Sequence, residues 1–198
     1  MSDLYGFLAP IYQMLSQGVF GEKILTANRA FVDENLSNKL VIIGGGDGFA
    51  YQQFGPRLKG MYLEKSAKML QIAQKNLKNS SLQFVHGEFQ GQSQADCFLL
   101  PFVLDCLREE DILALLEKIK SCLSENGIVI ISDFFPPKTR RQQVLSRLML
   151  LFFRATTGHP RSDLPDYPGL LSQSGFCLLK EKTWEKGWIK AQVYGRKD

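Results

Sequence analysis

A short apolar strand that breaks into glycines constrains this chain more than any other stretch. Residues 41–43 are β-branched (Val-Ile-Ile), which favours a buried strand. Four glycines follow within residues 44–48, where a backbone without Cβ atoms can turn tightly or let a ligand approach. Residues 49–54 indicate the first turns of a helix that ends near Gly55 and Pro56. Together these features predict a site for the polar end of a nucleotide-like ligand.

The glycine spacing separates two kinds of nucleotide site. The dinucleotide pattern G-x-G-x-x-G/A requires a third small residue, and that position falls on Phe49 or Tyr51. The spacing Gly44-x-Gly46-x-Gly48 instead resembles the glycine loop of class I methyltransferases, which use S-adenosylmethionine. A plain tight turn between a strand and a helix is the alternative.

A second strand supports the nucleotide interpretation. Residues 60–64 end in the carboxylate of Glu64, and residues 66–73 begin a helix with apolar residues near 3.6 spacing. A carboxylate at this position can accept hydrogen bonds from both hydroxyls of a ribose. The segment from Glu64 through Ala73 also resembles the corresponding methyltransferase segment, whereas the alternative is a solvated Glu at a strand end.

The resemblance to class I S-adenosylmethionine-dependent methyltransferases runs from about Tyr5 to the end of the chain and is strongest over residues 41–133. It implies an α/β fold: a Rossmann-like, doubly wound, seven-stranded sheet, mostly parallel, with a C-terminal antiparallel β-hairpin. It implies S-adenosylmethionine as the cofactor. The cofactor-binding residues that it implies are Tyr12, Gly44, Gly45, Gly46, Asp47, Gly48, Glu64, Lys65, Glu88, Phe89 and Leu100.

Two of these residues follow the third strand, residues 82–86. In the family an acid at the position of Glu88 bonds the adenine amino group, and the next residue packs near the ring; a surface-loop role for Glu88 is the alternative.

The fourth strand, residues 95–100, leads into Pro101 and Phe102. This sequence lacks both the N/D-P-P-Y/F motif of amine methylation on nucleobases and the Pro-Cys pair of cytosine methylation, so methylation of nucleic-acid bases is disfavoured.

The remaining elements complete a single domain of 198 residues. We expect a helix over 108–123, a turn at Asn126 and Gly127, a fifth strand over 128–131, helices over 138–157 and 166–174, and a hairpin of 176–184 with 188–194. Residues 3–37 predict two helices, the second with Phe31 and Val32 on its apolar face. The domain divides into an N-terminal helical cap (1–37), a cofactor-binding core (38–133), a helical acceptor-side segment (134–175) and the terminal hairpin (176–198).

Composition excludes several classes of protein. Twenty-four basic and 20 acidic residues give a net charge of +4, and the basic residues are scattered apart from 138–141, so no nucleic-acid partner is expected. The four cysteines and two histidines have no metal-ligand spacing, which predicts no metal and fits reduced thiols in a cytoplasm. No secretory signal is visible, and no apolar run reaches the ~18 residues of a membrane span.

The acceptor is expected to be a small, partly apolar molecule. Residues 5–12 resemble the N-terminal extension of the quinone-biosynthesis methyltransferases, in which such tyrosines cover cofactor and acceptor; packing onto the domain is the alternative. The apolar run 148–153 fits either a helix between the sheet and a cap or a wall of the acceptor pocket. Aromatic residues in these segments predict an acceptor site between the N-terminal helix and residues 134–165. They are Tyr5, Phe7, Tyr12, Phe134, Phe135, Phe152 and Phe153.

Methyl transfer from a sulfonium mainly requires alignment and exclusion of water. Where the acceptor must lose a proton, Asp133 and His159 are the candidate catalytic bases, each with a purely structural role as the alternative.

One residue departs from the family. Ile42 stands where an acid usually helps to hold the methionine end of the cofactor, a role that Asp47 could partly fill. A cofactor-binding protein without turnover is therefore the main rival function, and an NAD-dependent enzyme is a weaker one. The attacking atom of the acceptor (O, N, C or S) and the oligomeric state stay open.

Overall fold

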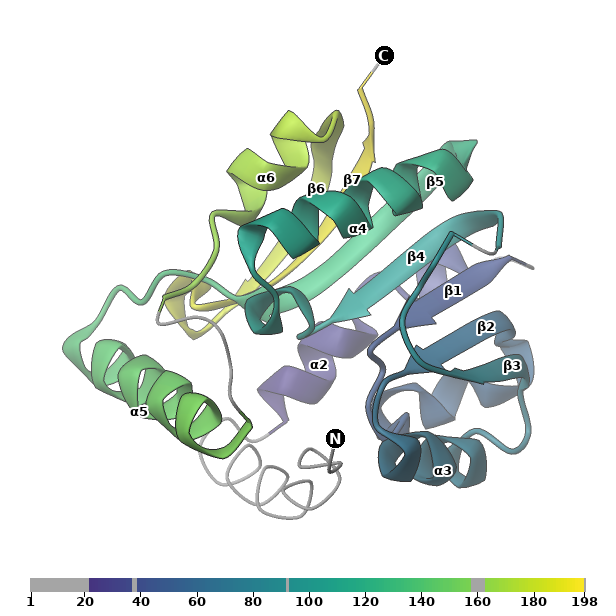
Figure 1. Ribbon diagram of the computed structural model, residues 1–198, viewed down its shortest axis with the longest axis horizontal. Helices are drawn as coiled ribbons and strands as arrows, with labels where there is room; N and C mark the ends of the chain where they lie inside the picture. Colours follow the sequence, from purple (N-terminus) through teal and green to yellow (C-terminus); the bar gives the residue numbers. More distant parts are fainter. Residues whose placement is uncertain (1–21, 37–38, 92, 158–162, 198) are drawn as a thin grey trace.

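The computed structural model of the chain describes residues 22–36, 39–91, 93–157 and 163–197. These residues form a seven-stranded sheet with helices on both faces (Figure 1). The strands are β1 (Leu40–Ile43), β2 (Lys59–Glu64), β3 (Ser81–His86), β4 (Ala95–Pro101), β5 (Leu123–Phe134), β6 (Phe176–Trp184) and β7 (Ile189–Arg196). Their order across the sheet is β3-β2-β1-β4-β5-β7-β6.

The strand directions confirm the fold predicted from the sequence. Strands β1 to β5 pair in parallel, whereas β7 runs antiparallel between β5 and β6 and forms the terminal hairpin with β6. The winding reverses between β1 and β4. In open α/β sheets this switch point, at the carboxyl ends of the strands, is where ligands bind.

The two faces of the sheet carry separate apolar cores. Val41 and Ile43 of β1 face a core shared with α4 (Glu109–Cys122) and α6 (Tyr167–Gln173), both of which cross one face of the sheet in Figure 1. Leu40 and Ile42 face the second core, shared with the 3-10 helix η2 (Phe49–Arg57) and α3 (Ala67–Asn76). Because both faces are covered, all four residues of β1 are buried.

The remaining helices lie near the ends of the strands. They are α2 (Lys23–Arg29), α5 (Arg140–Thr157) and the short 3-10 helices η1 (Asp33–Asn35), η3 (Leu104–Cys106) and η4 (Glu185–Gly187). α2 is fixed to the sheet by the Ser132 hydroxyl, which donates to the Ala27 carbonyl over 3.1 Å. In Figure 1, α5 lies beyond the end of the sheet where β4 and β5 finish.

Three element boundaries differ from those predicted. The second N-terminal helix ends at Arg29, because Ala30 is extended and Phe31 adopts a left-handed φ of 63°; both Phe31 and Val32 are nevertheless buried. The residues after the glycine loop form a 3-10 helix that continues through Pro56 to Arg57 rather than an α-helix that ends near Gly55. β5 begins at Leu123, which pairs with Ala95, so Asn126 and Gly127 lie within an irregular start of the strand rather than in a turn before it.

Two features are absent from the described residues. No described helix is both long enough and apolar enough to cross a membrane. In the same residues no group of three or more His, Cys, Asp or Glu side chains is placed to hold a metal ion. The division into cap, core, acceptor-side segment and hairpin stays a prediction, as does a cytoplasmic location.

Candidate cofactor-binding site

The glycine loop forms a turn that only glycine adopts without strain. Gly44, Gly46 and Gly48 have φ angles of +69°, +64° and +72°, a left-handed region that side chains with a Cβ disfavour. The Gly44 amide donates to the Leu63 carbonyl over 2.9 Å, which extends the β1–β2 ladder by one residue. The loop therefore starts where the ladder ends, at the switch point of the sheet.

Tyr62 supports the loop from below. Its hydroxyl donates to the Gly46 carbonyl over 3.1 Å, and a Cβ on Gly45 would collide with that hydroxyl. Burial, with smaller contributions from Tyr51, Glu64 and Asp47, raises the pKa of Tyr62 well above its usual value. The phenol therefore stays protonated and remains a donor.

The carboxylate of Glu64 connects the loop to the end of β2. Its Oε2 accepts the Gly46 amide over 2.9 Å, and its Oε1 accepts the Ser66 amide over 2.8 Å. A carboxylate oxygen can accept more than one hydrogen bond, so these contacts orient the group without exhausting its acceptor capacity. Glu64 is thus fixed beside the loop, and its role in ribose binding stays a prediction.

Of these three glycines, Gly46 is the one with open space above it. A Cβ on Gly44 would lie 2.8 Å from Cγ2 of Val103, and one on Gly48 would lie 2.9 Å from Cδ1 of Leu77. At Gly46 the same Cβ would meet nothing within 4 Å. The loop is packed against the fold at its two ends and presents free backbone surface at its centre.

Asp47 and α3 hold the far side of the loop. The Asp47 carboxylate accepts the Phe49 amide over 3.0 Å, just before η2 begins, and the Asp47 carbonyl accepts the Asn76 side-chain amide over 2.9 Å. Ser66 caps α3 by accepting the Met69 amide over 3.3 Å. Asp47 therefore has a structural role in the loop beside the cofactor role that the sequence predicts.

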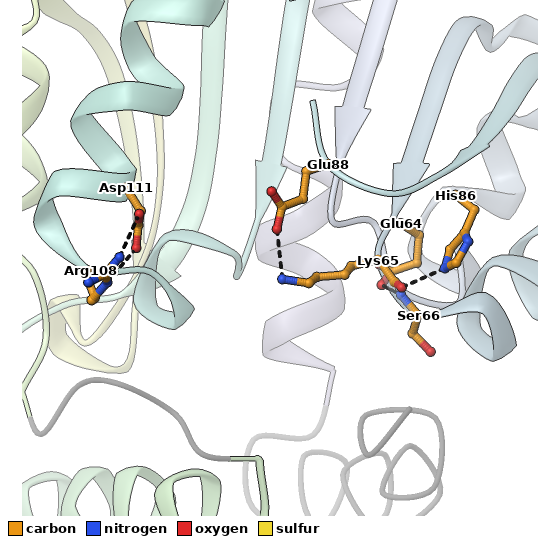
Figure 2. Close-up of polar contacts among 7 residues, drawn as sticks. All are labelled: Glu64, Lys65, Ser66, His86, Glu88, Arg108 and Asp111. Carbon is orange, nitrogen blue, oxygen red and sulfur yellow. Dashed lines mark hydrogen bonds and ion pairs between the residues drawn. The ribbon is translucent and has the colours of Figure 1, made fainter. Parts of the chain in front are cut away.

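Lys65 and Glu88 form an ion pair across the carboxyl ends of β2 and β3. Figure 2 shows the Lys65 side chain extended toward Glu88, and the Nζ–Oε1 distance is 2.8 Å. The Lys65 carbonyl lies 3.0 Å from Nε2 of His86, which holds the backbone at this point. Both members of the ion pair are largely exposed, so it contributes little to stability and can open.

Two predicted cofactor residues have side chains that are buried in the core. The side chain of Phe89 is 2% exposed and packs edge-on against Phe98, with ring centroids 5.3 Å apart. Leu100 is fully buried in the core beneath α4. Only the backbone of these two residues is available to a cofactor, because both side chains are packed in the core.

Asp133, a candidate base, is buried completely. Its Oδ1 accepts the Phe134 amide over 2.8 Å, and its Oδ2 accepts the Asp105 amide over 3.3 Å. Burial and the neighbouring Asp105 carboxylate raise the pKa of Asp133 well above its usual value, against the opposing effects of these amides and the Tyr167 hydroxyl. This geometry favours the structural alternative, in which Asp133 holds η3 against β5. Tyr12 and His159, by contrast, lie outside the described residues.

The aromatic residues predicted at the pocket mouth are only partly described. Phe134 and Phe135 are 1% and 4% exposed, and they pack against Trp188 and Tyr167 with ring centroids 5.6 and 5.0 Å apart. Both belong to the core rather than to an accessible wall. The side chains of Phe152 and Phe153 and the whole of residues 5–12 lie outside the described part of the chain.

Ile42, which replaces the usual acid, is fully buried among apolar residues of the second core. A carboxylate at this position would be desolvated, so the apolar residue suits its surroundings.

Three residues that position the site were not predicted from the sequence. They are Tyr62, Asn76 and Arg29, and the Nε of Arg29 donates to the Ala50 carbonyl over 2.9 Å. For Tyr62 the only available signal was its place two residues before Glu64 on the same strand.

Comparisons with known proteins concern the family and the fold of the chain. The profile of the O-methyltransferase domain family matches residues 11–177. The "Probable inactive O-methyltransferase 11" of Dictyostelium discoideum is 23% identical over 170 residues, which make up 84% of this chain and 51% of that protein. This chain therefore spans about half the length of its curated relative.

Two solved structures resemble the fold. The mitomycin 7-O-methyltransferase MmcR superposes with a TM-score of 0.72 at 20% identity, over 99% of this chain and 61% of that one. LepI in complex with SAM superposes with a TM-score of 0.62 at 18% identity, over 88% of this chain and 46% of that one.

Proposed function

Because this chain belongs to the O-methyltransferase domain family, we propose that it binds S-adenosylmethionine and methylates a hydroxyl oxygen of a small, partly apolar acceptor. The family membership confirms the prediction of a class I S-adenosylmethionine-dependent methyltransferase. The narrower resemblance to quinone-biosynthesis enzymes stays a prediction.

The observation that carries the proposal is the pairing of Gly46 with Glu64. Gly46 presents backbone to open space at a φ that glycine tolerates, and its amide is bonded to the Glu64 carboxylate at 2.9 Å. One ligand can therefore meet a Cβ-free backbone and a fixed carboxylate at the same time. A nucleoside whose sugar bears two hydroxyls and whose substituent must pass close to the backbone matches this arrangement.

The residues around the loop fit most of the cofactor. Glu64 would accept the ribose hydroxyls, Gly46 would allow the methionine portion to pass, and Glu88 would accept from the adenine amino group once Lys65 moves aside. The methionine end fits less well, since the position of Ile42 supplies no acid and is itself buried.

S-adenosylmethionine supplies a methyl group that is already activated on a sulfonium. The protein then has to hold the acceptor oxygen in line with that methyl and keep water out. The loop is suited to a fixed geometry, because Tyr62 and Glu64 bond the carbonyl and the amide of Gly46, and Asn76 bonds the carbonyl of Asp47. For proton removal from a hydroxyl, His159 remains the proposed base, because the buried Asp133 carboxylate is bonded within the fold.

Calorimetry with S-adenosylmethionine, S-adenosylhomocysteine and NAD in parallel tests the binding step. We expect the two adenosyl ligands to bind and NAD not to bind. Glu64→Gln keeps the shape of the side chain and removes its charge, and should weaken binding by roughly 1–3 kcal/mol. Glu125→Gln, on an exposed residue in β5, makes the same change outside the site and should leave affinity unaltered.

Gly46→Val is the complementary variant. Its branched side chain would occupy the open space at Gly46, and the left-handed φ of this position is unfavourable for valine, so the substitution should abolish binding. Circular dichroism and a thermal melt on the same sample separate this loss from unfolding. Undiminished binding in a folded Gly46→Val protein, or equal affinity in Glu64→Gln, would show that the ligand lies elsewhere.

A second candidate function is cofactor binding without methyl transfer. Two observations favour it: an apolar, buried residue stands at position 42, and the Asp133 carboxylate is turned into the fold. Binding of S-adenosylmethionine without label transfer to any of a panel of phenolic and hydroxylated acceptors would support it. Transfer to a single acceptor at catalytic turnover would exclude it.

A further inference from the structure

Helix α5 exposes two apolar residues on its outer side, while its inner side buries two polar residues beside Leu145 and Leu150. Gln142 and Ser146, on the side that meets the fold, are each 5% exposed, whereas Val144 and Leu148 are 55% and 59% exposed. A surface helix normally buries its apolar stripe and exposes its polar residues. Val144 and Leu148 depart from this pattern, because both are apolar and both lie on the outer face of α5.

The inner face is held by specific polar contacts. The Gln142 amide donates to the Glu185 carbonyl over 2.7 Å, and its oxygen accepts the amides of Lys138 and Thr139 over 2.9 and 3.1 Å. The Ser146 hydroxyl accepts the Trp188 indole N–H over 3.1 Å. These contacts fix which side of the helix faces outward, so the exposure of Val144 and Leu148 is built into the fold.

Basic side chains surround the exposed apolar pair. At 100° per residue, Arg140, Val144 and Leu148 lie along one line of the helix, and Arg141 and Arg147 flank it on either side. All three arginines are exposed, and within residues 22–36, 39–91, 93–157 and 163–197 none of them forms an ion pair with a carboxylate. The sequence has no acidic residue from 138 to 162, so the charge of this segment is uncompensated along the chain.

We propose that the outer face of α5 docks on an anionic membrane surface. Arginines would meet lipid phosphates and carboxylates, and Val144 and Leu148 would enter the boundary between headgroups and acyl chains, which is how a basic amphipathic helix lies on a bilayer. A second copy of the chain fits less well, because a two-fold contact through this face would bring arginines against arginines. A nucleic acid would leave the exposed apolar residues without a partner.

The position of α5 gives this docking a consequence. The helix lies at the end of the sheet where β4 and β5 finish, the same end as the glycine loop (Figure 1). If the proposed function holds, a partly apolar acceptor dissolved in the bilayer would be presented on the side where the cofactor binds. The docking itself does not depend on that function, since it is measured without cofactor or acceptor.

Flotation with phosphatidylcholine vesicles, with and without 30% phosphatidylserine (roughly physiological anionic content), tests the proposal. We expect the protein to float with the anionic vesicles and not with the neutral ones, and to be released as salt is raised. Replacement of Arg140, Arg141 and Arg147 by Gln should weaken binding about fivefold per residue, and thus on the order of 100-fold together. The matched control, Lys59→Gln, Lys75→Gln and Lys78→Gln, removes three exposed charges from another face and should bind as the wild type does.

A second variant tests the apolar part independently. Val144→Ser with Leu148→Ser keeps all the charges and should weaken vesicle binding about tenfold or more. An unaffected double variant would mean a purely electrostatic partner such as a nucleic acid, and would overturn the proposal. So would a lack of binding to anionic vesicles, or a wild-type dimer in light scattering that this double variant dissociates, which would assign the face to a second copy.

Discussion

Removal of the Asp133 carboxylate should change how the stability of this protein depends on pH. The side chain is 0% exposed and has a second carboxylate, that of Asp105, beside it. Burial is the larger cause and Asp105 the smaller one, and together they raise the pKa of Asp133 well above its ordinary value of 3.8. Asp133→Asn removes the titrating proton and keeps the size of the side chain.

The sign follows from proton binding. Between the unfolded pKa near 3.8 and the higher folded pKa, the folded wild type holds a proton that the unfolded chain has lost. Its free energy of unfolding therefore falls as pH rises through this range, by up to about 1.4 kcal/mol per pH unit. Over two units, the stability of the wild type relative to Asp133→Asn should fall by up to about 3 kcal/mol. The amide donates where the carboxylate accepts, which adds an offset that does not vary with pH.

Urea unfolding of both proteins at half-unit steps from pH 4.5 to 7.5 measures this difference. Asp111→Asn is an informative control, because the hydrogen bond and charge of Arg108 lower the pKa of that exposed carboxyl (Figure 2). Its contribution to stability is present above the unfolded pKa near 3.8 and is lost only as pH falls below it, so from pH 4.5 to 7.5 the Asp111→Asn profile should run parallel to that of the wild type. Parallel profiles for the wild type and Asp133→Asn would refute the reasoning, because they would mean that Asp133 has the same pKa folded and unfolded.

Three further predictions concern contacts around the site. Gly45→Ala should destabilise the fold by about 1–3 kcal/mol in chemical denaturation, because its methyl collides with the Tyr62 hydroxyl. Gly46→Ala meets no neighbour and should lose about 1–2 kcal/mol to its φ of +64°; a loss below about 1 kcal/mol in Gly45→Ala would contradict this packing. Ser146→Ala should destabilise by about 1–3 kcal/mol, since it removes the acceptor of the Trp188 indole, and a double-mutant cycle with Trp188→Phe should recover part of the loss. Lys65→Ala should leave the melting temperature almost unchanged while altering affinity for S-adenosylmethionine, because its exposed ion pair lies where the adenine would bind.

Local sequence patterns, together with the resemblance to class I methyltransferases, predicted the sheet and the position of the glycine loop. The β-branched run before Gly44 and the alternating residues of the terminal hairpin each point to one element, and the order of these elements allows few topologies. The position of Glu64 was predictable for the same reason. The carboxyl end of β2 lies beside the carboxyl end of β1, so a carboxylate there lies next to the glycine loop.

What the sequence did not predict depends on the direction of single side chains. Asp133 follows a strand, as a catalytic base could, yet its carboxylate points inward because η3 returns to meet it. Phe89 follows Glu88 but faces the core. For α5, the apolar run that begins at Leu148 suggested burial, whereas the contacts of Gln142 and Ser146 rotate that residue outward.

A titration of the ¹⁵N-labelled protein with S-adenosylmethionine, followed by amide chemical shifts, tests the proposed site most directly. The amides of Gly44 to Gly48 and of Glu64 to Ser66 should shift together with one dissociation constant, with Gly46 among the largest changes, because its N–H bonds the carboxylate that the ribose would meet. Amides of the outer face of α3 and of the β6 edge should not move. A saturable set of shifts confined to those surfaces, or no shifts at millimolar ligand (about the weakest affinity of interest, −4 kcal/mol), would contradict the account.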